Sequence, residues 1–493
     1  MIKKQLKTAM AGACVAMAAV PTVAQEKPNI IFIYADDMGY SDLQCYGSQV
    51  NDTPNFDRMA SEGMRFTDFY AGANVSTPSR ACLMTGRYPT RMGIYHVFFP
   101  ESFTGMDPNE ITMAEMLKDE GYSTAIFGKW HLGIDWQYRP LRQGFDEFYG
   151  TACSIDNPPV VYIDNDTPTN VPANKDSITF VTTQKALSFI ERKKDGPFFC
   201  YVAYNMPHVP IAASDNFKGK SRNGLYGDVI MELDWGIGEI MAKVKELGLD
   251  ENTIICFSSD NGPWLTEGPY GGCALPLAWG KGTTWDGGHR VPMIVRWPGH
   301  IEAGQVTTDV ALMADWFPTF ASICGGDVPT DRVIDGYDIS PILFGTGKRP
   351  NEDIAFIDMR GLNAYRSGDW KLKLPEREVK GNYWQADTPA HDTVLFNLRE
   401  DIGEQQDVKE QHPEIVEMIL HKMDSLTATG LLAPRIFQTE WQTDMLNQQQ
   451  RMQNVLKAAE EGRGPASEKG QAILEYYQAM EKFQKSSARG SIF

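Results

Sequence analysis

The sequence predicts an α/β protein in which a large domain with an open sheet precedes a smaller α+β domain. Two observations favour this fold: short apolar runs alternate with amphipathic stretches as far as about residue 350, and polar side chains gather just beyond the ends of these runs. The length agrees, since 493 residues suit one large domain and one small domain.

Residues 1–24 have the pattern of a secretory signal peptide. Three lysines precede a short run that is rich in alanine, and Thr22, Val23 and Ala24 are small residues typical of a cleavage site. The run is too short to predict a spanning helix. We expect a periplasmic or secreted protein with no stable membrane insertion after cleavage. The alternatives are a retained N-terminal anchor and a surface lipoprotein attached through Cys14.

The large domain is expected over residues 25–350 and begins with an apolar run at 30–34. Further strands are predicted in "STAIFGKWHLG", "PFFCYVAYNMPHVP", "TIICFSSDNG" and "VPMIVRWPG", with helices before the first and third of these. The polar residues that follow the strands are Asp36, Asp37, Lys129, His131, His208, Asp260 and Asn261. Such a pattern indicates a site at the carboxyl edge of the sheet.

The smaller domain is expected over residues 351–435, after the linker-like segment "GKRPNED". The stretches "AYRSGDWKLKL" and "DTVLFNLRED" predict short antiparallel strands, and "HPEIVEMILHKM" predicts a helix. Residues 436–493 are rich in Gln, Glu and Lys with helical spacing, so they predict a helical C-terminal extension.

The charge of the chain limits its partners. With 46 basic and 64 acidic residues, the formal net charge is −18, and cleavage after Ala24 would remove three lysines and no acid. Such a protein is not expected to bind nucleic acid or long polyanions through its general surface. An anionic substrate would therefore need a local positive pocket. The eight cysteines include no CxxC pair, so no zinc site is predicted.

Four residues at two distant strand ends form a candidate metal site: Asp36, Asp37, Asp260 and Asn261. Three carboxylates and one amide oxygen suit Ca²⁺ or Mg²⁺ rather than zinc. Either pair alone would more often be a turn or a helix cap. Because both pairs follow apolar strands in one α/β chain, the metal site is the favoured interpretation.

Three cations lie beside glycines and could balance a doubly charged anion: Arg80, Lys129 and Lys281. His131 and His208 lie just past strand ends, where a general acid or base would be placed. The aromatic residues near Lys281 are Trp264, Tyr270, Trp279 and Trp285. They could stack on a sugar, although such residues more often serve packing.

The segment "NVSTPSRACLMTGRYPT", residues 74–90, predicts a helix with proline near its start and glycine at its end. Ser76 stands at the start, either as a cap or as a nucleophile, and a helix N-terminus favours anions. The residues alone predict an exported α/β hydrolase with a divalent metal. Phosphate and sulfate esters both fit this description.

The segment "STPSRACLMTGR" resembles the sulfatase signature, and "GKWHLG" resembles the second signature of that family. "ADDMGY", "SDNG" and "GKGTTWDGG" are similar to its metal and lysine segments, in the same order. The resemblance covers about residues 27–400 and is to the arylsulfatase type within the alkaline phosphatase superfamily. It implies a large alkaline-phosphatase-like domain with a central mixed sheet flanked by helices, and a smaller C-terminal domain with a four-stranded sheet.

The resemblance implies that Ser76 is oxidised to Cα-formylglycine by a sulfatase-maturing enzyme of the bacterial type that acts on serine. One hydroxyl of the hydrated aldehyde would attack sulfur and the other would later expel sulfate. Asp36, Asp37, Asp260 and Asn261 would bind Ca²⁺ together with the modified Ser76, with Mg²⁺ as the alternative.

The resemblance also implies roles for the cations and histidines. Arg80 would hold the hydrate, and Lys129 and Lys281 would hold the sulfate oxygens. His131 would assist collapse of the sulfated intermediate, and His208 would protonate the leaving alcohol. The expected substrate is a sulfated sugar or an aryl sulfate. The rival interpretations are a phosphate or phosphonate monoester hydrolase of the same superfamily and an inactive glycan-binding homologue.

Overall fold

The computed structural model describes residues 27–99, 104–157, 160–170, 173–380, 385–436 and 455–460, with a few further residues up to 478. The predicted signal peptide, Cys14 and most of the predicted extension at 436–493 lie outside the described residues. Among the helices that the structure describes, none is long and apolar enough to cross a membrane.

The larger unit is built on a ten-stranded sheet with the order β11-β2-β10-β9-β1-β8-β4-β5-β6-β7. Its five central strands are parallel: β9 (Thr253–Ser259), β1 (Asn29–Ala35), β8 (Phe198–Ala203), β4 (Ser123–Lys129) and β5 (Glu147–Thr151). The outer strands are β11 (Gln305–Thr307), β2 (Met64–Phe66), β10 (Met293–Arg296), β6 (Tyr162–Asp164) and β7 (Thr167–Pro168). Because β10 and β6 run antiparallel to their central neighbours, the sheet is mixed. This confirms the predicted fold class.

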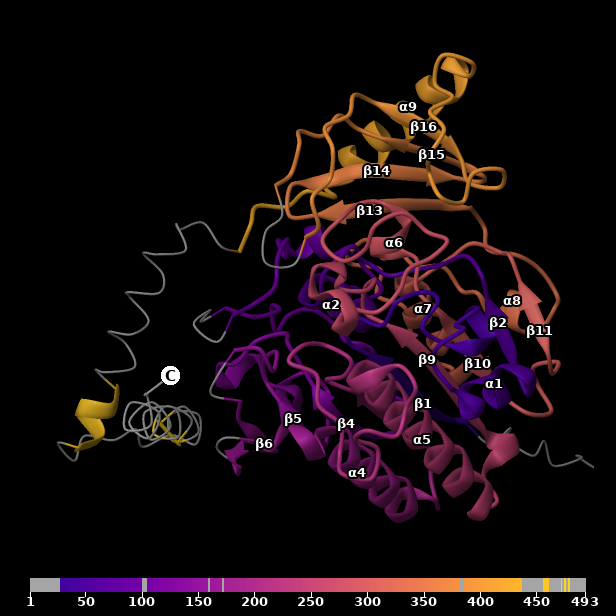
Figure 1. Cartoon of the computed structure of the whole chain (residues 1–493). Helices are drawn as coiled ribbons and strands as arrows, with labels where there is room; N and C mark the ends of the chain where they lie inside the picture. Colours follow the sequence, from indigo (N-terminus) through magenta and orange to yellow (C-terminus); the bar gives the residue numbers. More distant parts are fainter. Residues whose placement is uncertain are drawn as a thin grey trace, which may run out of the picture.

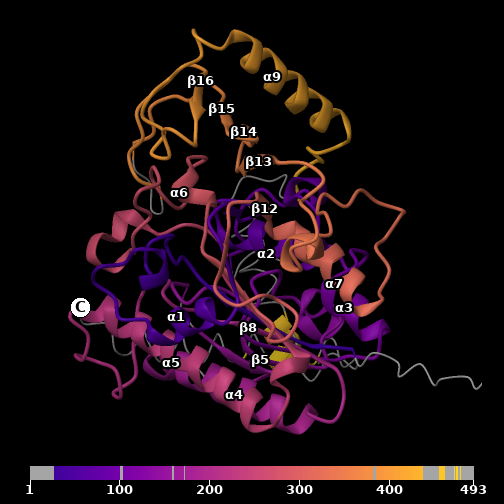
Figure 2. The same ribbon diagram turned by 90° about the vertical axis from the view of Figure 1, so that its right-hand side faces the viewer.

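Helices cover both faces of this sheet (Figures 1 and 2). One face carries α1 (Pro54–Ser61), α4 (Ile178–Lys193) and α5 (Gly224–Glu246). The other carries α2 (Ser76–Thr85), α3 (Met113–Asp119) and α7 (Trp316–Cys324). Each face of the sheet has its own hydrophobic core. In β1, Ile31 and Ile33 pack in the core on the face of α1, α4 and α5, whereas Phe32 and Tyr34 pack in the core on the face of α2, α3 and α7. A strand that is buried on both faces must be continuously apolar, which explains the run at 30–34.

Short elements complete the larger unit. They are the two-stranded pair β3 (Phe69–Tyr70) and β12 (Ala311–Leu312), and the helices α6 (Asp286–His289) and α8 (Ser340–Leu343). Helix α3 begins with a capping box, because the Thr112 side chain accepts from the Glu115 N–H and the Glu115 side chain accepts from the Thr112 N–H.

The smaller unit is an antiparallel sheet of β13 (Asp353–Asp358), β14 (Gly361–Ser367), β15 (Trp370–Lys373) and β16 (Val394–Asn397). Figure 2 shows α9 (Pro413–Ala428) on its outer side, away from the large sheet. Asp353, the last residue of the segment "GKRPNED", is the first residue of β13. That strand pairs with β14 through a short turn in which Asp358 faces Gly361.

A buried ionic network joins the two units. Lys371 Nζ of β15 lies 2.8 Å from Asp286 Oδ1 and 2.7 Å from Glu404 Oε1. Arg366 of β14 lies 2.6 Å from Asp68 of the larger unit. Removing one partner of such a buried pair is costly, so these contacts fix the small sheet over α6. Figure 1 shows β13 and β14 in this position.

Candidate active site

The predicted site residues come together at one edge of the large sheet. The strands β9, β1, β8 and β4 are consecutive neighbours and parallel, so their carboxyl ends lie side by side. The residues at or just after these ends are Asp260 and Asn261, Asp36 and Asp37, His208, and Lys129 and His131. Helix α2 brings Ser76 and Arg80 to the same edge, and the loop after β9 brings Lys281.

The backbone turns sharply at two of these positions. Asp37 has φ 68° and His131 has φ 60°, both in the left-handed region that residues other than glycine seldom adopt. The turn after β1 allows the Asp37 N–H to donate to Asp260 Oδ1 at 3.1 Å. Backbone in this region is costly and often accompanies functional sites, because there the side-chain direction matters more than local stability.

Ser76 is the first residue of α2, but its side chain does not cap the helix. Val75 occupies the cap position, with no side-chain hydrogen bond. The Ser76 hydroxyl instead donates to Asp36 Oδ1 at 3.0 Å, and Lys129 Nζ donates to the same hydroxyl oxygen at 3.2 Å. Ser76 is therefore oriented by the strand ends and not by its own helix, which fits a reacting group better than a cap.

Arg80 ties α2 to the sheet. Its Nε and one terminal nitrogen donate to Asp260 Oδ2 at 3.1 and 2.8 Å, and the other terminal nitrogen donates to the Lys129 carbonyl at 3.2 Å. Burial alone would lower the pKa of Arg80, but Asp260 and other neighbours raise it, so the guanidinium stays protonated. Because Arg80 lies four residues after Ser76, both project from the same face of α2.

The two lysines pair with the other two carboxylates. Lys129 Nζ lies 2.6 Å from Asp36 Oδ2, and Lys281 Nζ lies 2.7 Å from Asp37 Oδ2. Lys281 also lies over the ring of Trp264, 4.2 Å from its centre, where the ring face attracts the ammonium group. Three buried cations therefore face three buried carboxylates, so a divalent cation held by the carboxylates would leave the cluster with the net positive charge that an anion needs.

The electrostatics differ between the two aspartates nearest Ser76. Burial alone would raise the pKa of Asp36, but Lys129, His208 and Arg80 lower it overall, so this carboxylate is ionised. Burial raises the pKa of Asp260, and the charge of Asp36 raises it further. Such opposed shifts are typical of carboxylates crowded into one functional site.

The oxygen set fits a hard divalent cation. Asn261 Nδ2 donates to Asp37 Oδ1 at 2.7 Å, whereas the amide oxygen Oδ1 is buried with no hydrogen bond to any residue that the structure describes. A buried acceptor without a donor is costly, and a bound cation would satisfy it. Ligand atoms of Asp36, Asp37 and His208 also lie within 4.8 Å of one another.

The two histidines have different surroundings. His131 Nε2 lies 2.9 Å from the Phe98 carbonyl oxygen. Burial lowers the pKa of His131 well below its usual value, and the charges of Lys129 and Arg80 lower it further, so this ring is neutral. His208 Nδ1 lies 2.5 Å from the Val209 carbonyl oxygen, and its Nε2 lies 3.6 Å from Asp37 Oδ2. The Nε2 atom of His208 thus faces the Asp37 carboxylate and not the backbone.

A cavity of about 200 Å³ lies against these groups, and Ser76, His131, His208 and Lys281 line it. Sequence reasoning missed one further polar group, Ser154. Its hydroxyl lies 3.2 Å from His208 Nε2 and 3.5 Å from Lys129 Nζ, so it bridges the two sides of the site. Ser154 follows β5, a strand of five residues that the sequence pattern did not reveal.

The four aromatic residues near Lys281 do not form one surface. Trp264 lines the cavity. Trp285 instead packs against Phe396 of the small sheet with ring centres 5.6 Å apart, and Tyr270 is 47% exposed and lines a different cavity. A continuous sugar platform made of all four is therefore not formed.

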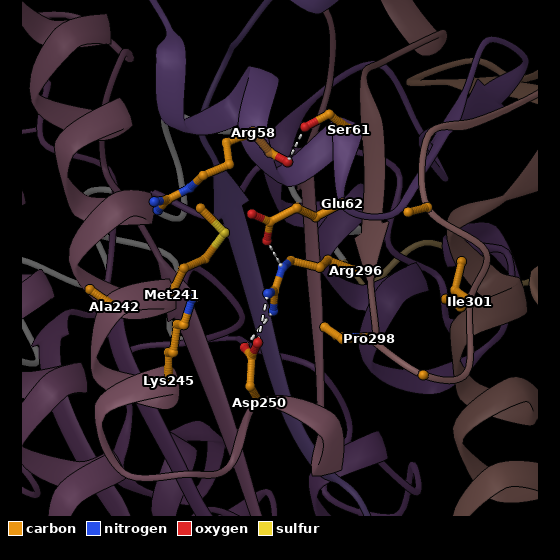
Figure 3. A pocket seen from close by; sticks show the side chains of 12 residues that line it. Arg58, Ser61, Glu62, Met241, Ala242, Lys245, Asp250, Arg296, Pro298 and Ile301 are labelled. Carbon is orange, nitrogen blue, oxygen red and sulfur yellow. Dashed lines mark hydrogen bonds and ion pairs between the residues drawn. The ribbon is translucent and has the colours of Figure 1, made fainter.

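A larger cavity, of about 650 Å³, lies away from the predicted residues. Figure 3 shows Arg296 between Glu62 and Asp250, with hydrogen bonds of 2.6 and 2.7 Å. The buried guanidinium of Arg296 is thus already paired with two carboxylates. None of the predicted catalytic or metal-binding residues lines it, so size alone does not identify the active site.

The arrangement defines a class of enzyme. A hydroxyl held by a carboxylate, an oxygen set that suits a hard metal, and a lysine on the wall of a small cavity together suit an α/β hydrolase of esters of tetrahedral anions. Ser76, the four predicted metal ligands and the three cations all lie within one hydrogen-bonded cluster. This is the class that the residues alone predicted.

Comparisons with known proteins define the family. The family model described as Sulfatase matches residues 28–326. Arylsulfatase A of Homo sapiens is 37% identical over 431 residues, covering 79% of this chain and 84% of that protein. N-acetylgalactosamine-6-sulfatase of Rattus norvegicus is 41% identical over 382 residues, covering 71% and 72%.

A solved structure agrees with these relatives. A Bacteroides thetaiotaomicron 6S-sulf protein, described with the metabolism of multiple glycosaminoglycans, superposes with a TM-score of 0.75 at 30% identity. The match covers 82% of this chain and 100% of that one. The chain therefore belongs to the sulfatase family and is a sulfuric ester hydrolase. Both predictions from the sequence, the family and the enzyme class, are confirmed.

Proposed function

We propose that this sulfatase removes sulfate from sugars of sulfated glycans, using Ser76 in the form of Cα-formylglycine and a bound Ca²⁺. One observation carries the proposal: the Ser76 side chain lies between Asp36 Oδ1, at 3.0 Å, and Lys129 Nζ, at 3.2 Å, on the wall of a cavity that Lys281 also lines. A group held in this way has both an acceptor for its proton and a cation for the charge of the ester.

Asp36, Asp37, Asp260 and Asn261 would hold the calcium ion, with Mg²⁺ as the alternative hard cation. The metal lowers the pKa of a bound hydroxyl and neutralises sulfate charge, and formylglycine supplies a hydrated aldehyde as nucleophile. Lys129 and Lys281 orient the sulfate by binding its oxygens. Arg80 keeps the first turn of α2 in place. His208 Nε2 is available to donate a proton to the leaving alcohol.

The relatives and the size of the cavity both indicate a sulfated sugar as the substrate. The similar proteins include an N-acetylgalactosamine-6-sulfatase and a structure described with glycosaminoglycan metabolism. A cavity of about 200 Å³ is too small for an extended stretch of a glycan chain. With a net charge of −18, the general surface repels long polyanions. Both properties favour release of sulfate from one terminal sugar over movement along a chain.

The proposal also includes export of the protein and maturation of Ser76, which both precede catalysis. The pattern of residues 1–24 supports export to the periplasm or the medium, with attachment through Cys14 as the alternative. The serine at position 76 requires a sulfatase-maturing enzyme that oxidises serine, so that enzyme is a necessary partner.

The first experiment measures the mass of the tryptic peptide from Phe66 to Arg80, taken from protein purified from its native host. A peptide lighter than the serine form by two hydrogens supports formylglycine at Ser76. The purified protein is then assayed with matched sulfate and phosphate monoesters. A peptide that carries only serine would contradict the mechanism through formylglycine. Faster turnover of phosphate esters would favour the phosphatase alternative, and glycan binding without turnover would favour an inactive homologue.

A further inference from the structure

A second cavity, of about 220 Å³, lies between α2 and the small sheet. From the larger unit it is lined by Asn74 and Gly282, and from the smaller unit by Asp358, Arg360 and Glu376. The small sheet therefore contributes charged side chains to a space beside the catalytic edge. Nothing in the chemistry assigned to the sulfate group uses these residues.

The second cavity adjoins the catalytic cavity at three separate points of the chain. Val75 lines both cavities. His96 and Gly282 line the second cavity, and their chain neighbours Val97 and Lys281 line the catalytic cavity. Since consecutive Cα atoms are about 3.8 Å apart, the two spaces are immediate neighbours. The Gly282 N–H donates to the Asn74 carbonyl at 3.0 Å, which fixes their shared wall.

The charges in this cavity exclude a second anion. Arg360 is the one lysine or arginine among the described residues that line it. Its guanidinium is already hydrogen-bonded to Asp358 Oδ2 at 3.0 Å and to Glu376 Oε1 at 2.6 Å. An incoming sulfate or carboxylate would meet two carboxylates and no unpaired cation, which is unfavourable in a partly buried space. The cavity is therefore suited to an uncharged, hydrogen-bonding group.

One buried donor lacks a partner at this place. Asn74 is 2% exposed, and its Nδ2 makes no hydrogen bond to any residue within the described part of the chain. A buried N–H group without an acceptor is costly, so a native protein seldom keeps one unless a ligand or water completes it. Asn74 stands two residues before Ser76, so a ligand bound by Asn74 would also reach the nucleophile.

We propose that this second cavity binds the uncharged ring of the sugar whose sulfate occupies the catalytic cavity. The inference rests on the proposed function and adds to it the part of the substrate beyond the sulfate. Asn74 Nδ2 donates to an oxygen of the ring, and Glu376 accepts from its hydroxyls, since a carboxylate offers about four lone-pair sites and Arg360 uses one of them. Asp358 already accepts four hydrogen bonds, from Arg360 and Asn363, and holds Arg360 in place. Sugars with one sulfate and no second charge are the substrates that this lining selects.

The test compares Glu376→Gln and Asn74→Ala with the unchanged protein and with Glu378→Gln. Glu378 is a matched control because it lies on the same segment but pairs with Lys380 at the surface. Each protein is assayed with its best substrate from a panel of monosulfated monosaccharides and with 4-nitrophenyl sulfate, which has no sugar. Where the aryl ester is not turned over, inhibition by inorganic sulfate replaces it. The mass of the 66–80 peptide shows that Ser76 is equally modified in each variant.

The expected result is a fall in kcat/KM for the sugar of about tenfold or more in Glu376→Gln and Asn74→Ala, the cost of one lost hydrogen bond to a charged or buried group. For 4-nitrophenyl sulfate, or for the inhibition constant of sulfate, the change should stay within about threefold. A disulfated sugar should be a poorer substrate of the unchanged protein.

Equal losses on both esters, no loss on the sugar, or efficient turnover of disulfated sugars would overturn the inference. Activity on aryl sulfates with no activity on any monosulfated sugar would overturn it as well. If the unchanged protein carries serine at position 76 and hydrolyses none of these esters, the proposed function itself has failed, which is a different result.

Discussion

The guanidinium of Arg80 holds Asp260 Oδ2 with two hydrogen bonds, at 2.8 and 3.1 Å. This contact joins the first turn of α2 to the end of β9, and it lies one helical turn from Ser76. The position of Ser76, the proposed nucleophile, therefore depends on an ion pair between a helix and the sheet. A lysine at position 80 could keep the charge but not the two-pronged contact.

Ser76→Ala should abolish turnover and leave the fold intact. The substitution removes the reacting hydroxyl and very little volume. We expect kcat to fall by at least about a thousandfold, as when a nucleophile is deleted elsewhere, with an unchanged circular dichroism spectrum. Ser61→Ala, an exposed serine on α1, is the control and should retain full activity. A Ser76→Ala protein with normal sulfatase activity would contradict the whole mechanism.

Asp260→Ala should lose bound metal as well as activity. The substitution removes one of the four proposed oxygen ligands, and Arg80 loses the carboxylate that accepts two of its hydrogen bonds. Calcium and magnesium are measured by mass spectrometry on protein dialysed against a trace of each ion. Asp250→Ala, which alters the cavity in Figure 3, should keep both metal and rate. If Asp260→Ala binds calcium as the unchanged protein does, Asp260 is not a ligand.

Ser154→Ala should lower kcat/KM by about tenfold, the cost of one lost hydrogen bond to charged neighbours. The hydroxyl bridges His208 Nε2 and Lys129 Nζ, so its loss lets both move relative to the sulfate. Ser177→Ala serves as the control, since that residue is only partly buried and hydrogen-bonds locally to Asn174. An unchanged kcat/KM would exclude a role for Ser154.

Lys371→Met should destabilise the protein by about 3 to 5 kcal/mol, because the change leaves Asp286 and Glu404 buried without their cation. Methionine keeps most of the length of the lysine, so the lost charge dominates. Urea unfolding followed by tryptophan fluorescence measures the difference. Lys380→Met changes a surface lysine, 76% exposed in its side chain, and should have almost no effect. Equal stability of the two variants would rule out the network as the link between the sheets.

Asp42 should make stability fall as the pH rises. It accepts hydrogen bonds from the Gly39 and Cys273 N–H groups and from the Tyr226 hydroxyl, yet burial raises its pKa to about 7. The folded protein therefore holds a proton that the unfolded chain releases near pH 4. Between pH 5 and pH 8, this group should remove about 2 to 3 kcal/mol from the free energy of unfolding.

Asp42→Asn cannot ionise, so its unfolding free energy should show a smaller decline over the same interval. Urea titrations at pH 5 and pH 8 measure both proteins, with Asp52→Asn at the surface as the control. The same decline in Asp42→Asn and in the unchanged protein would assign the pH dependence to other groups.

Much of this site could be predicted because its residues follow strands that are plain in the sequence. The runs before Asp36 and Asp260 are continuously apolar, and two pairs of oxygen ligands placed directly after such runs favour a shared metal. Strand β5 could not be recognised, because it has only five residues and the fourth of them is Gly150. A Cβ at Gly150 would lie 1.8 Å from the Gly128 carbonyl oxygen, so the pairing of β4 and β5 needs glycine there. Without β5, nothing in the sequence pointed to Ser154.

The residues that the smaller unit contributes to the second cavity could not be predicted from the sequence either. Asp358, Arg360 and Glu376 look like ordinary surface charges when read along the chain. Only the docking of β13 and β14 over α6 brings them beside Asn74. Contacts between segments almost 300 residues apart depend on the tertiary fold, which no local pattern encodes.

The burial of α2 also fixes an order of events. All ten of its residues are buried, and Ser76 is 1% exposed, so no second protein can reach this side chain once the chain has folded. If Ser76 is oxidised by another enzyme, that enzyme must act first. A chain that folds too early would be correct in shape and permanently inactive. The yield of active sulfatase in any host would then depend on how fast Ser76 is oxidised relative to the rate of folding.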